Sequence, residues 1–253
     1  MTKNKTSKLD IFGLTDEGLV REHNEDYISW SADSGLVILA DGMGGHNAGE
    51  VASELAVRSV TDALEEVLSP DVKDACKMDF KEVVHDAVTF ANDEINLHAK
   101  THPECTGMGT TIVMTLFHKN KVIIASVGDS RIYRFRKGEL KQVTTDHSLV
   151  QEMIDNGYMS EEEAINSSNR NLITRALGIA EEVDVDVAED KVEKNDIYLL
   201  CSDGLSDMIT DDIIFSTLVK SRQDLKRATK NLVELAKEHG GHDNVSVILV
   251  ACK

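Results

Sequence analysis

Four short apolar segments of this chain are each flanked by an aspartate, and this pattern constrains the fold more than any other feature. Short apolar runs of this length are typical of buried strands. The pairs are 36–40 with Asp41, 122–127 with Asp129, 197–201 with Asp203, and 245–251 with Asp243. Carboxylates gathered at strand ends repel one another unless cations neutralise them. The pattern therefore favours a divalent-metal site beside a buried sheet, with ordinary turn aspartates as the alternative.

The stretch 41–45, Asp-Gly-Met-Gly-Gly, lies between a predicted strand and a helix predicted over 48–68, where apolar residues keep an i, i+3, i+4 spacing. Glycine permits positive φ and close approach of the backbone to a ligand. The turn can therefore offer carbonyl oxygens together with the Asp41 carboxylate, which is the ligand set that Mg²⁺ and Mn²⁺ prefer. A solvated glycine-rich turn explains this stretch equally well when it is taken alone.

Hydrophobic periodicity predicts two pairs of helices separated by a block of strands. The strands are expected at 9–14, 27–30, 36–40, 110–117, 121–127, 132–135, 140–143, 183–187, 197–201 and 245–251. The longer helices are expected at 48–68, 80–99, 211–219 and 221–239. Two short helices are expected between 146 and 176, the second starting at a capping box formed by Ser160 and Glu163. This order predicts an α+β fold in which helices cover antiparallel sheets.

No internal repeat or linker divides the chain, so one domain over 1–253 is expected, with 146–176 as an insertion over the core. Hydrophobic residues make up 41% of the 253 residues, which suffices for a substantial core. The formal net charge of -18 argues against nucleic-acid and anionic-membrane partners.

The cysteines and the hydropathy pattern predict a soluble cytoplasmic protein. Cys76, Cys105, Cys201 and Cys252 form no CxxC pair and are interpreted as reduced thiols. Residues 1–8 lack the apolar stretch of a signal peptide. No apolar run approaches the roughly 18 residues that a membrane helix needs.

Six motifs occur in order along the chain with specific spacing. They are Arg-Glu-His-Asn-Glu-Asp at 21–26, Asp-Gly-Met-Gly-Gly at 41–45, Gly-Met-Gly-Thr-Thr at 107–111, Val-Gly-Asp-Ser-Arg at 127–131, Cys-Ser-Asp-Gly at 201–204, and His-Asp-Asn-Val at 242–245. Together they resemble the metal-dependent type 2C (PPM-type) serine/threonine protein phosphatases in their compact bacterial form, over about 9–251. The resemblance implies a four-layer αββα sandwich of two antiparallel sheets flanked by helix pairs. It also implies that 146–176 is a flap that touches protein substrates.

The resemblance assigns ligands for two main Mn²⁺ or Mg²⁺ ions. Asp41 is expected to bridge them, and the Gly42 carbonyl to contact one of them. Asp203 and Asp243 are expected to complete the first site, and Glu25 to support the second.

Two further acids have roles by the same resemblance. Asp26 is expected to act through waters of the metal shell. Asp129, together with Asp203, is expected to hold a third, weaker ion.

Arg21 is expected to bind the substrate phosphate, because a guanidinium fork pairs with two phosphate oxygens at once. Without the resemblance, Arg21 is better interpreted as a surface arginine paired with Glu22 or Glu25. The implied reaction is in-line attack of a metal-activated water on phosphorus, which requires no protein nucleophile.

The chain departs from many relatives at Met43, where they carry a histidine that protonates the leaving group. Methionine cannot donate a proton, so we hypothesise that a metal-bound water takes this role. His46 and His242 are the alternative donors, although each is better explained as a loop or helix-start residue.

Two other classes of function fit the sequence less well than a phosphatase does. A pseudophosphatase that only binds phosphoproteins is disfavoured because Asp41, Asp203 and Asp243 are all present. A calcium-binding protein is disfavoured because 183–187 lacks the glycine and glutamate of an EF-hand loop. The expected partners are phosphorylated proteins, including a cognate serine/threonine kinase or an anti-sigma-pathway phosphoprotein, acted on by a monomer.

Overall fold

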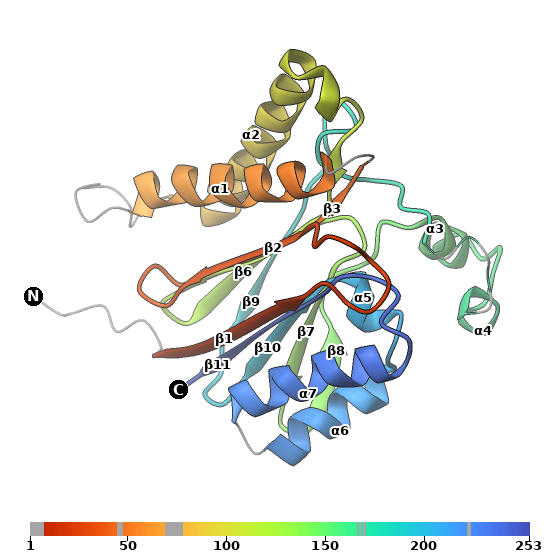
Figure 1. Ribbon diagram of the computed structural model, residues 1–253. Coiled ribbons are helices and arrows are strands. Elements are labelled where there is room, and N and C mark those ends of the chain that lie inside the picture. The colour runs from red at the N-terminus through yellow and green to blue at the C-terminus, as the bar shows by residue number, and fades with distance from the viewer. Residues whose placement is uncertain are drawn as a thin grey trace, which may run out of the picture.

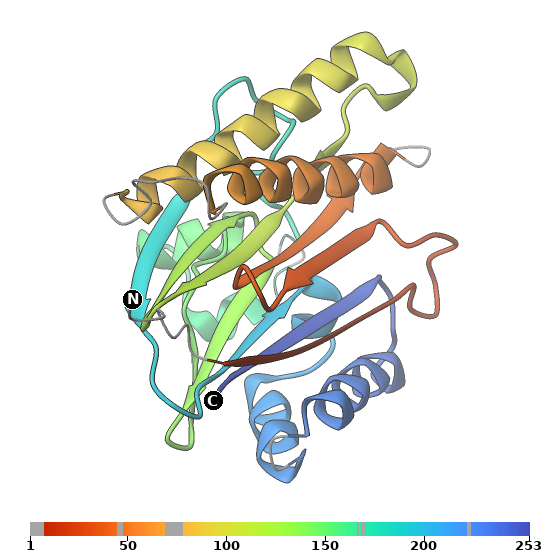
Figure 2. The same cartoon turned by 90° about the vertical axis from the view of Figure 1, so that its left-hand side faces the viewer.

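The computed structural model describes residues 8–44, 48–68, 78–165, 167, 169, 171–221 and 224–253. Two antiparallel sheets stack face to face, and a helix pair covers the outer face of each (Figures 1 and 2). The predicted four-layer αββα sandwich is therefore confirmed. No helix in the described part of the chain is long and apolar enough to cross a membrane.

The first sheet has the strand order β1-β11-β10-β7-β8, and every neighbouring pair is antiparallel. Its strands are β1 Leu9–Asp16, β7 Arg131–Arg136, β8 Glu139–Gln142, β10 Ile197–Cys201 and β11 Val245–Cys252. The second sheet has the order β2-β3-β5-β6-β9, with β4 paired to the end of β3. Its strands are β2 Asp26–Ser31, β3 Leu36–Met43, β4 Gly109–Thr110, β5 Ile112–His118, β6 Lys121–Val127 and β9 Asp186–Lys191.

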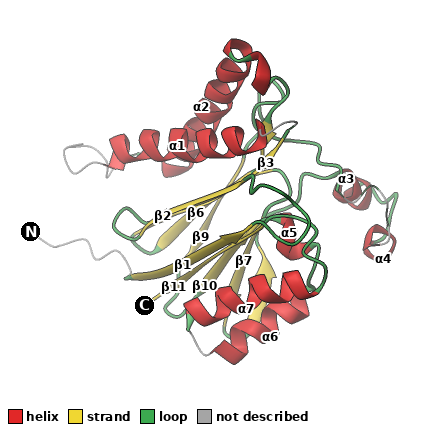
Figure 3. Cartoon of the chain, viewed as in Figure 1, coloured by secondary structure: helices red, strands yellow, loops and turns green. Residues whose placement is uncertain are grey.

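The helices fall into two covering pairs and several short pieces, as the colouring by secondary structure shows (Figure 3). The pair α1 Ala48–Leu68 and α2 Phe80–Thr101 packs on the second sheet. The pair α6 Asp211–Ser221 and α7 Leu225–Glu238 packs on the first. The short helices are α3 Leu149–Asp155, α4 Glu161–Ile165 and α5 Asp203–Ser206, with a 3₁₀ turn at Pro103–Cys105.

Three hydrophobic layers hold the sandwich together, one between the sheets and one under each helix pair. Along β10, Leu199 packs toward the helices, whereas Leu200 packs toward the other sheet. This alternation explains the unbroken apolar runs: strands buried on both faces need apolar side chains at every position. The central strands are thereby rigid, and their ends are fixed positions for polar side chains.

The segment 146–176 leaves the sandwich after β8 and carries α3 and α4 to one side of it (Figure 1). The predicted capping box is confirmed at α4: Ser160 N donates to Glu163 Oε2 at 2.9 Å, and Glu163 N donates to Ser160 Oγ at 3.3 Å.

Three predicted elements have a boundary that differs from the structure by three or more residues. The strand predicted at 183–187 begins at Asp186 and runs to Lys191, because its pairing with β6 extends from Asp186 opposite Ser126 to Lys191 opposite Lys121. The helix predicted from 221 begins at Leu225, because the Asp224 side chain accepts from Arg227 N and caps it there.

The strand predicted to end at residue 40 continues to Met43. It does so because Gly42 and Met43 pair with Thr110 and Gly109 of β4. The first part of the predicted glycine-rich turn is therefore strand.

Candidate metal centre

Asp41 and Asp26 lie directly opposite each other on β3 and β2, which places two like charges on one cross-strand pair. Such a pair is destabilising unless something compensates it. The Asp41 backbone is held on both sides: its N–H donates to Thr111 Oγ1 at 3.2 Å, and its carbonyl accepts from Thr110 Oγ1 at 2.8 Å. Ser202 Oγ donates to Asp26 Oδ2 at 2.9 Å and fixes that carboxylate as well.

Asp203 and Asp243 come from the first sheet, at the end of β10 and just before β11. The backbones beside these two acids lie close together, because Gly204 has no side chain. A Cβ on Gly204 would lie 1.9 Å from the Asn244 carbonyl oxygen, a distance that no other residue type tolerates. Both acids lie near enough to Asp41 for their charges to raise its pKa.

Asp129 lies in the link between β6 and β7, which joins the two sheets. Gly128 before it has φ +105° and touches Thr111 so closely that a Cβ would lie 2.6 Å from the threonine methyl carbon. His147 holds Gly128 from the other side with two hydrogen bonds. Its ring Nδ1 accepts from Gly128 N at 3.0 Å, and its backbone N–H donates to Gly128 O at 2.9 Å.

Burial and mutual repulsion raise the pKa values of these carboxyls. Burial raises the pKa of Asp41 well above its usual range, and Asp26, Asp203, Asp129 and Asp243 raise it further. Burial, followed by repulsion from Asp129 and Asp243, likewise raises the pKa of Asp203 well above its usual range. The five aspartates therefore form one electrostatic cluster.

The other two perturbed members of the cluster have more moderate shifts. Burial raises the pKa of Asp26 to about 6, and hydrogen bonds from Ser246 and Ser202 oppose the shift. Burial raises the pKa of Asp129 to about 6, with repulsion from Asp146 as the next cause. Perturbed carboxyls gathered in this way are typical of functional sites.

Two buried oxygens in the cluster, Asp26 Oδ1 and Asp203 Oδ1, have no hydrogen-bond partner. Buried polar atoms are normally satisfied, so unpartnered carboxylate oxygens within a cluster of like charge fit a cation. Gly42 packs closely against the first turn of α1, because a Cβ there would lie 2.1 Å from the Gly49 carbonyl oxygen. Among the described residues, no three His, Cys, Asp or Glu side chains are already grouped around a single ion position. The donor chemistry therefore fits divalent cations, although the side chains are not gathered as a finished coordination shell.

Arg21 Nη2 donates to Asp243 Oδ2 at 2.7 Å, so the candidate phosphate ligand is paired with a candidate metal ligand. This ion pair corrects the local interpretation, which paired Arg21 with Glu22 or Glu25. Glu25 lies against Gly49 in the first turn of α1, and burial raises its pKa. Its carboxylate faces the end of a helix that favours negative charge.

Of the two candidate proton donors, the structure describes His242. His46 lies outside the described residues, as does Cys76. His242 is exposed and packs its ring over Gly240. Met43 is half-buried on β3 opposite Gly109.

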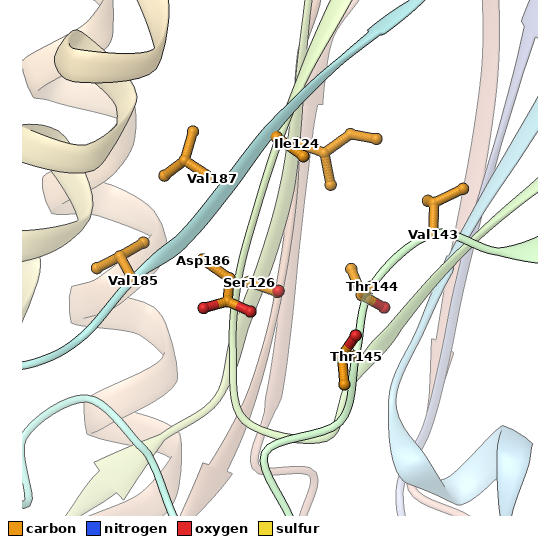
Figure 4. Close-up of a pocket in the computed structure, with 9 residues that line it drawn as sticks. Ile124, Ser126, Val143, Thr144, Thr145, Val185, Asp186 and Val187 are labelled. Carbon is orange, nitrogen blue, oxygen red and sulfur yellow. The ribbon is translucent and has the colours of Figure 1, made fainter. Parts of the chain in front are cut away.

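A cavity of about 490 Å³ opens between the acids and α3. It is lined by Asp129, Arg131, Asp146, Ser148, Val150, Gln151, Ile154, Ala164, Asp203, Ser206, Asp207, Met208, Ile209, Thr210 and Asp211. A second cavity, of about 400 Å³, lies between β6, residues 143–145 and the start of β9 (Figure 4). Hydroxyls of Ser126, Thr144 and Thr145 and the Asp186 carboxylate line it together with valines (Figure 4). Only the first cavity includes members of the aspartate cluster.

Sequence reasoning missed the residues that hold the aspartates in place. Thr110, Thr111, Ser202 and Asn244 are all buried and hydrogen-bonded to the acids or to the backbone beside them. Each lies inside one of the six motifs, so the signal was present. The residues drew no attention because hydroxyl and amide side chains suggest no metal chemistry of their own.

Three comparisons with known proteins agree with this geometry. A family model described as "Protein phosphatase 2C" matches residues 20–243. The serine/threonine phosphatase stp of Listeria welshimeri is 38% identical over 243 residues, covering 93% of each chain. The crystal structure of the serine/threonine phosphatase PstP/Ppp of Mycobacterium tuberculosis superposes with a TM-score of 0.87 at 38% identity, covering 97% of this chain and 99% of that one. A structure of the PstP catalytic domain with two manganese ions superposes with a TM-score of 0.84 at 37% identity, covering 96% of this chain and 97% of that one.

Proposed function

Because this chain belongs to the protein phosphatase 2C family, we propose that its aspartate cluster is the metal centre of a phosphatase acting on phosphoserine and phosphothreonine in proteins. The chain is a metal-dependent serine/threonine protein phosphatase. The observation that best supports this location is the electrostatic cluster around Asp41, in which buried carboxylate oxygens of Asp26 and Asp203 lack partners.

Each acid has a role that its position supports. Asp41 is proposed to bridge two ions because acids from both sheets lie near enough to raise its pKa. Asp203 and Asp243 are proposed to complete one site, and the Gly42 carbonyl and Glu25 to contribute to the other. Two divalent cations bound there would supply an activated water as nucleophile and would neutralise charge on the phosphoryl oxygens.

Two roles are finer proposals. Asp26 is proposed to orient water in the metal shell, since the Ser202 hydroxyl donates to its Oδ2 and limits its movement. Asp129, with Asp203, is proposed to hold a third, weaker ion at the cavity beside α3, which both residues line.

Arg21 is proposed to bind the phosphoryl group. Its guanidinium is half-exposed beside Asp243 and can present two parallel N–H groups to phosphate oxygens. The segment 146–176 is proposed as a flap that contacts the substrate, because α3 walls the cavity next to the acids.

The expected partner is a cognate serine/threonine kinase together with its targets, and the protein is proposed to act as a cytoplasmic monomer. The net charge of -18 supports partners other than nucleic acid. The described cysteines Cys105, Cys201 and Cys252 are free and buried, which supports a reducing compartment.

Hydrolysis of p-nitrophenyl phosphate and of a phosphothreonine peptide tests the function directly. With Mn²⁺ present we expect turnover of both substrates, and with excess chelator we expect none. Binding of the phosphopeptide without hydrolysis in Mn²⁺ would instead identify a phosphoprotein-binding module. His46→Ala separates the proton-donor hypotheses, because loss of phosphopeptide turnover with retention of p-nitrophenyl phosphate turnover would assign the proton to His46.

Replacing Arg21 by alanine should change metal and phosphate binding in opposite directions. We expect kcat/KM for the phosphopeptide to fall about 10- to 100-fold, since a hydrogen bond to a charged group contributes about 1.5–3 kcal/mol. We expect Mn²⁺ to bind roughly two- to fivefold more tightly, because Asp243 loses a competing partner worth about 0.5–1 kcal/mol at this exposure. Titration calorimetry and steady-state kinetics measure the two effects.

Arg58→Ala is the matched control, because Arg58 is exposed on α1 and forms an ion pair with the nearby Glu54. It should change neither quantity. Weaker Mn²⁺ binding by Arg21→Ala would contradict competition for Asp243.

A further inference from the structure

Residues 17–25, called here the arm, connect β1 to β2 and carry Arg21 and Glu25. The arm has no regular secondary structure, so its own backbone does not fix its position. It lies on the segment 240–244: Leu19 N donates to Gly241 O at 2.8 Å. A Cβ on Gly18 would lie 2.2 Å from the Asp243 carbonyl oxygen. The arm therefore needs an anchor from outside itself to hold Arg21 in place.

The side chain of Asn244 provides three hydrogen bonds, all to the backbone of the arm. Its Oδ1 accepts from Glu25 N at 2.8 Å, and its Nδ2 donates to Glu17 O at 3.0 Å and to His23 O at 2.9 Å. The two carbonyls and one N–H that face the amide fix which end is oxygen and which is nitrogen. Asn244 is 4% exposed, so each of these bonds is protected from water.

The backbone of Asn244 is joined to the aspartate cluster. Its N–H donates to Asp243 Oδ1 at 2.8 Å. On the other side of the arm, the Glu25 carbonyl accepts from Gly42 N at 3.1 Å and from Ser53 Oγ at 2.6 Å. The peptide around Glu25 is thus held between Asn244 and the strand that carries Asp41.

The Arg21 side chain, by contrast, is exposed and held by its ion pair with Asp243. A long arginine side chain on an anchored backbone can exchange one anionic partner for another without moving the chain. The same side chain on a loose backbone samples many positions, and a misplacement of about 1 Å can cost roughly a hundredfold in rate.

We propose that Asn244 is a positioning residue for phosphate recognition: its amide anchors the arm to the segment 240–244, which bears Asp243, so that Arg21 reaches the phosphoryl group. This inference rests on the proposed function, because it takes Arg21 as the phosphate ligand. Asn244 acts through Arg21 and does not itself touch the substrate.

A double-mutant cycle tests this role. Asn244→Ala, Arg21→Ala and the double variant are compared with the wild type at saturating Mn²⁺, using a phosphothreonine peptide. We expect Asn244→Ala to lower kcat/KM about 10- to 30-fold, chiefly through KM. We expect the double variant to lose no more than Arg21→Ala alone, because two residues that act through one contact are not additive. Multiplicative losses would overturn the proposal.

Asn92 offers a matched control for the loss of a buried amide. It is fully buried on α2 and makes the same set of bonds: its Oδ1 accepts from Gly178 N at 2.8 Å, and its Nδ2 donates to the carbonyls of Ala180 and Glu181 at 3.2 and 3.1 Å. Asn92→Ala should lower the melting temperature as Asn244→Ala does while leaving KM unchanged. An equal rise of KM in both variants would reduce the Asn244 effect to general destabilisation and overturn the proposal.

Asn244→Asp distinguishes the effect of the two donated hydrogen bonds from the effect of filling the same space. Aspartate keeps the shape and the acceptor for Glu25 N, but it turns an oxygen toward the carbonyls of Glu17 and His23. It should therefore raise KM at least as much as alanine does. Wild-type KM in a folded Asn244→Asp variant would show that the two donated bonds do not position the arm.

Binding of inorganic phosphate to the Mn²⁺-loaded protein gives a readout that needs no turnover. We expect Asn244→Ala to weaken phosphate binding about tenfold, with Mn²⁺ bound no more weakly than in the wild type. Unchanged phosphate binding with weaker Mn²⁺ binding would assign Asn244 to the metal centre instead. A wild type that fails to hydrolyse the peptide refutes the proposed function, whereas the anchoring role is still decided by phosphate binding.

Discussion

Asp41→Asn should reduce phosphatase turnover at least about 1,000-fold while making the metal-free protein more stable. The loss follows from removing the acid that interacts with all four other members of the cluster. A metal centre supplies several kcal/mol of transition-state stabilisation, and about 4 kcal/mol corresponds to a thousandfold in rate. The gain in stability follows because the neutral amide removes repulsion among buried carboxylates and keeps the shape of the side chain.

Steady-state kinetics and thermal melts in chelator measure the two effects. The melting temperature of the metal-free variant should rise by roughly 2–4 °C for each kcal/mol of repulsion removed. Asp33→Asn, which neutralises an exposed aspartate between β2 and β3, is the control and should change neither quantity. An Asp41→Asn protein that is inactive but less stable than the wild type in chelator would contradict the repulsion argument.

The metal-free protein should become more stable as the pH falls from about 7.5 toward 5, which is the opposite of the usual acid response. A carboxyl whose pKa is higher in the folded than in the unfolded chain binds more protons when folded. Stability is therefore gained as the pH falls through the folded pKa, and the gain is complete below the unfolded value. For Asp26, with a folded pKa of about 6 against an ordinary 3.8, the window lies between those two values. Once complete, this protonation of Asp26 adds about 3 kcal/mol to the free energy of unfolding.

Added Mn²⁺ should reverse this trend, because the ions bind ionised carboxylates and release protons. Thermal melts between pH 5 and 7.5, with chelator and with Mn²⁺, give two curves whose separation should widen as the pH rises. Free Mn²⁺ at a hundred times its dissociation constant raises the free energy of unfolding by about 2.7 kcal/mol for each site. A melting temperature in chelator that stays flat or rises with pH over this range would refute the picture of a repulsive cluster.

The strands buried on both faces were the most predictable part of the fold. Ile197–Cys201 was predicted to the residue, since it is apolar at every position and ends at polar residues. The edge strand β9 was misplaced because its boundaries depend on where β6 stops, which its own side chains do not encode. Helix α5 was missed because four residues are too few to show a period.

For the site, the strand-end pattern singled out four of the five aspartates that form the electrostatic cluster, but not how they are held. The aspartates stood out because each follows or precedes a strongly apolar strand. The pairing of Arg21 with Asp243 joins residues 222 positions apart, and no local pattern encodes such a contact. Asn244 was overlooked for a related reason: its three partners are backbone groups of the arm, and a backbone group leaves no mark in the amino-acid sequence.

The five clustered aspartates are divided between the two sheets. Asp26 and Asp41 belong to β2 and β3, Asp203 and Asp243 flank β10 and β11, and Asp129 lies on the crossing between β6 and β7. Neither sheet alone carries a complete set. On the metal roles proposed above, a small slip of one sheet over the other would separate the metal ligands before any strand unfolds. On this proposal, catalysis depends on the interface between the two sheets, and weaker metal binding should be the earliest sign that this interface is opening.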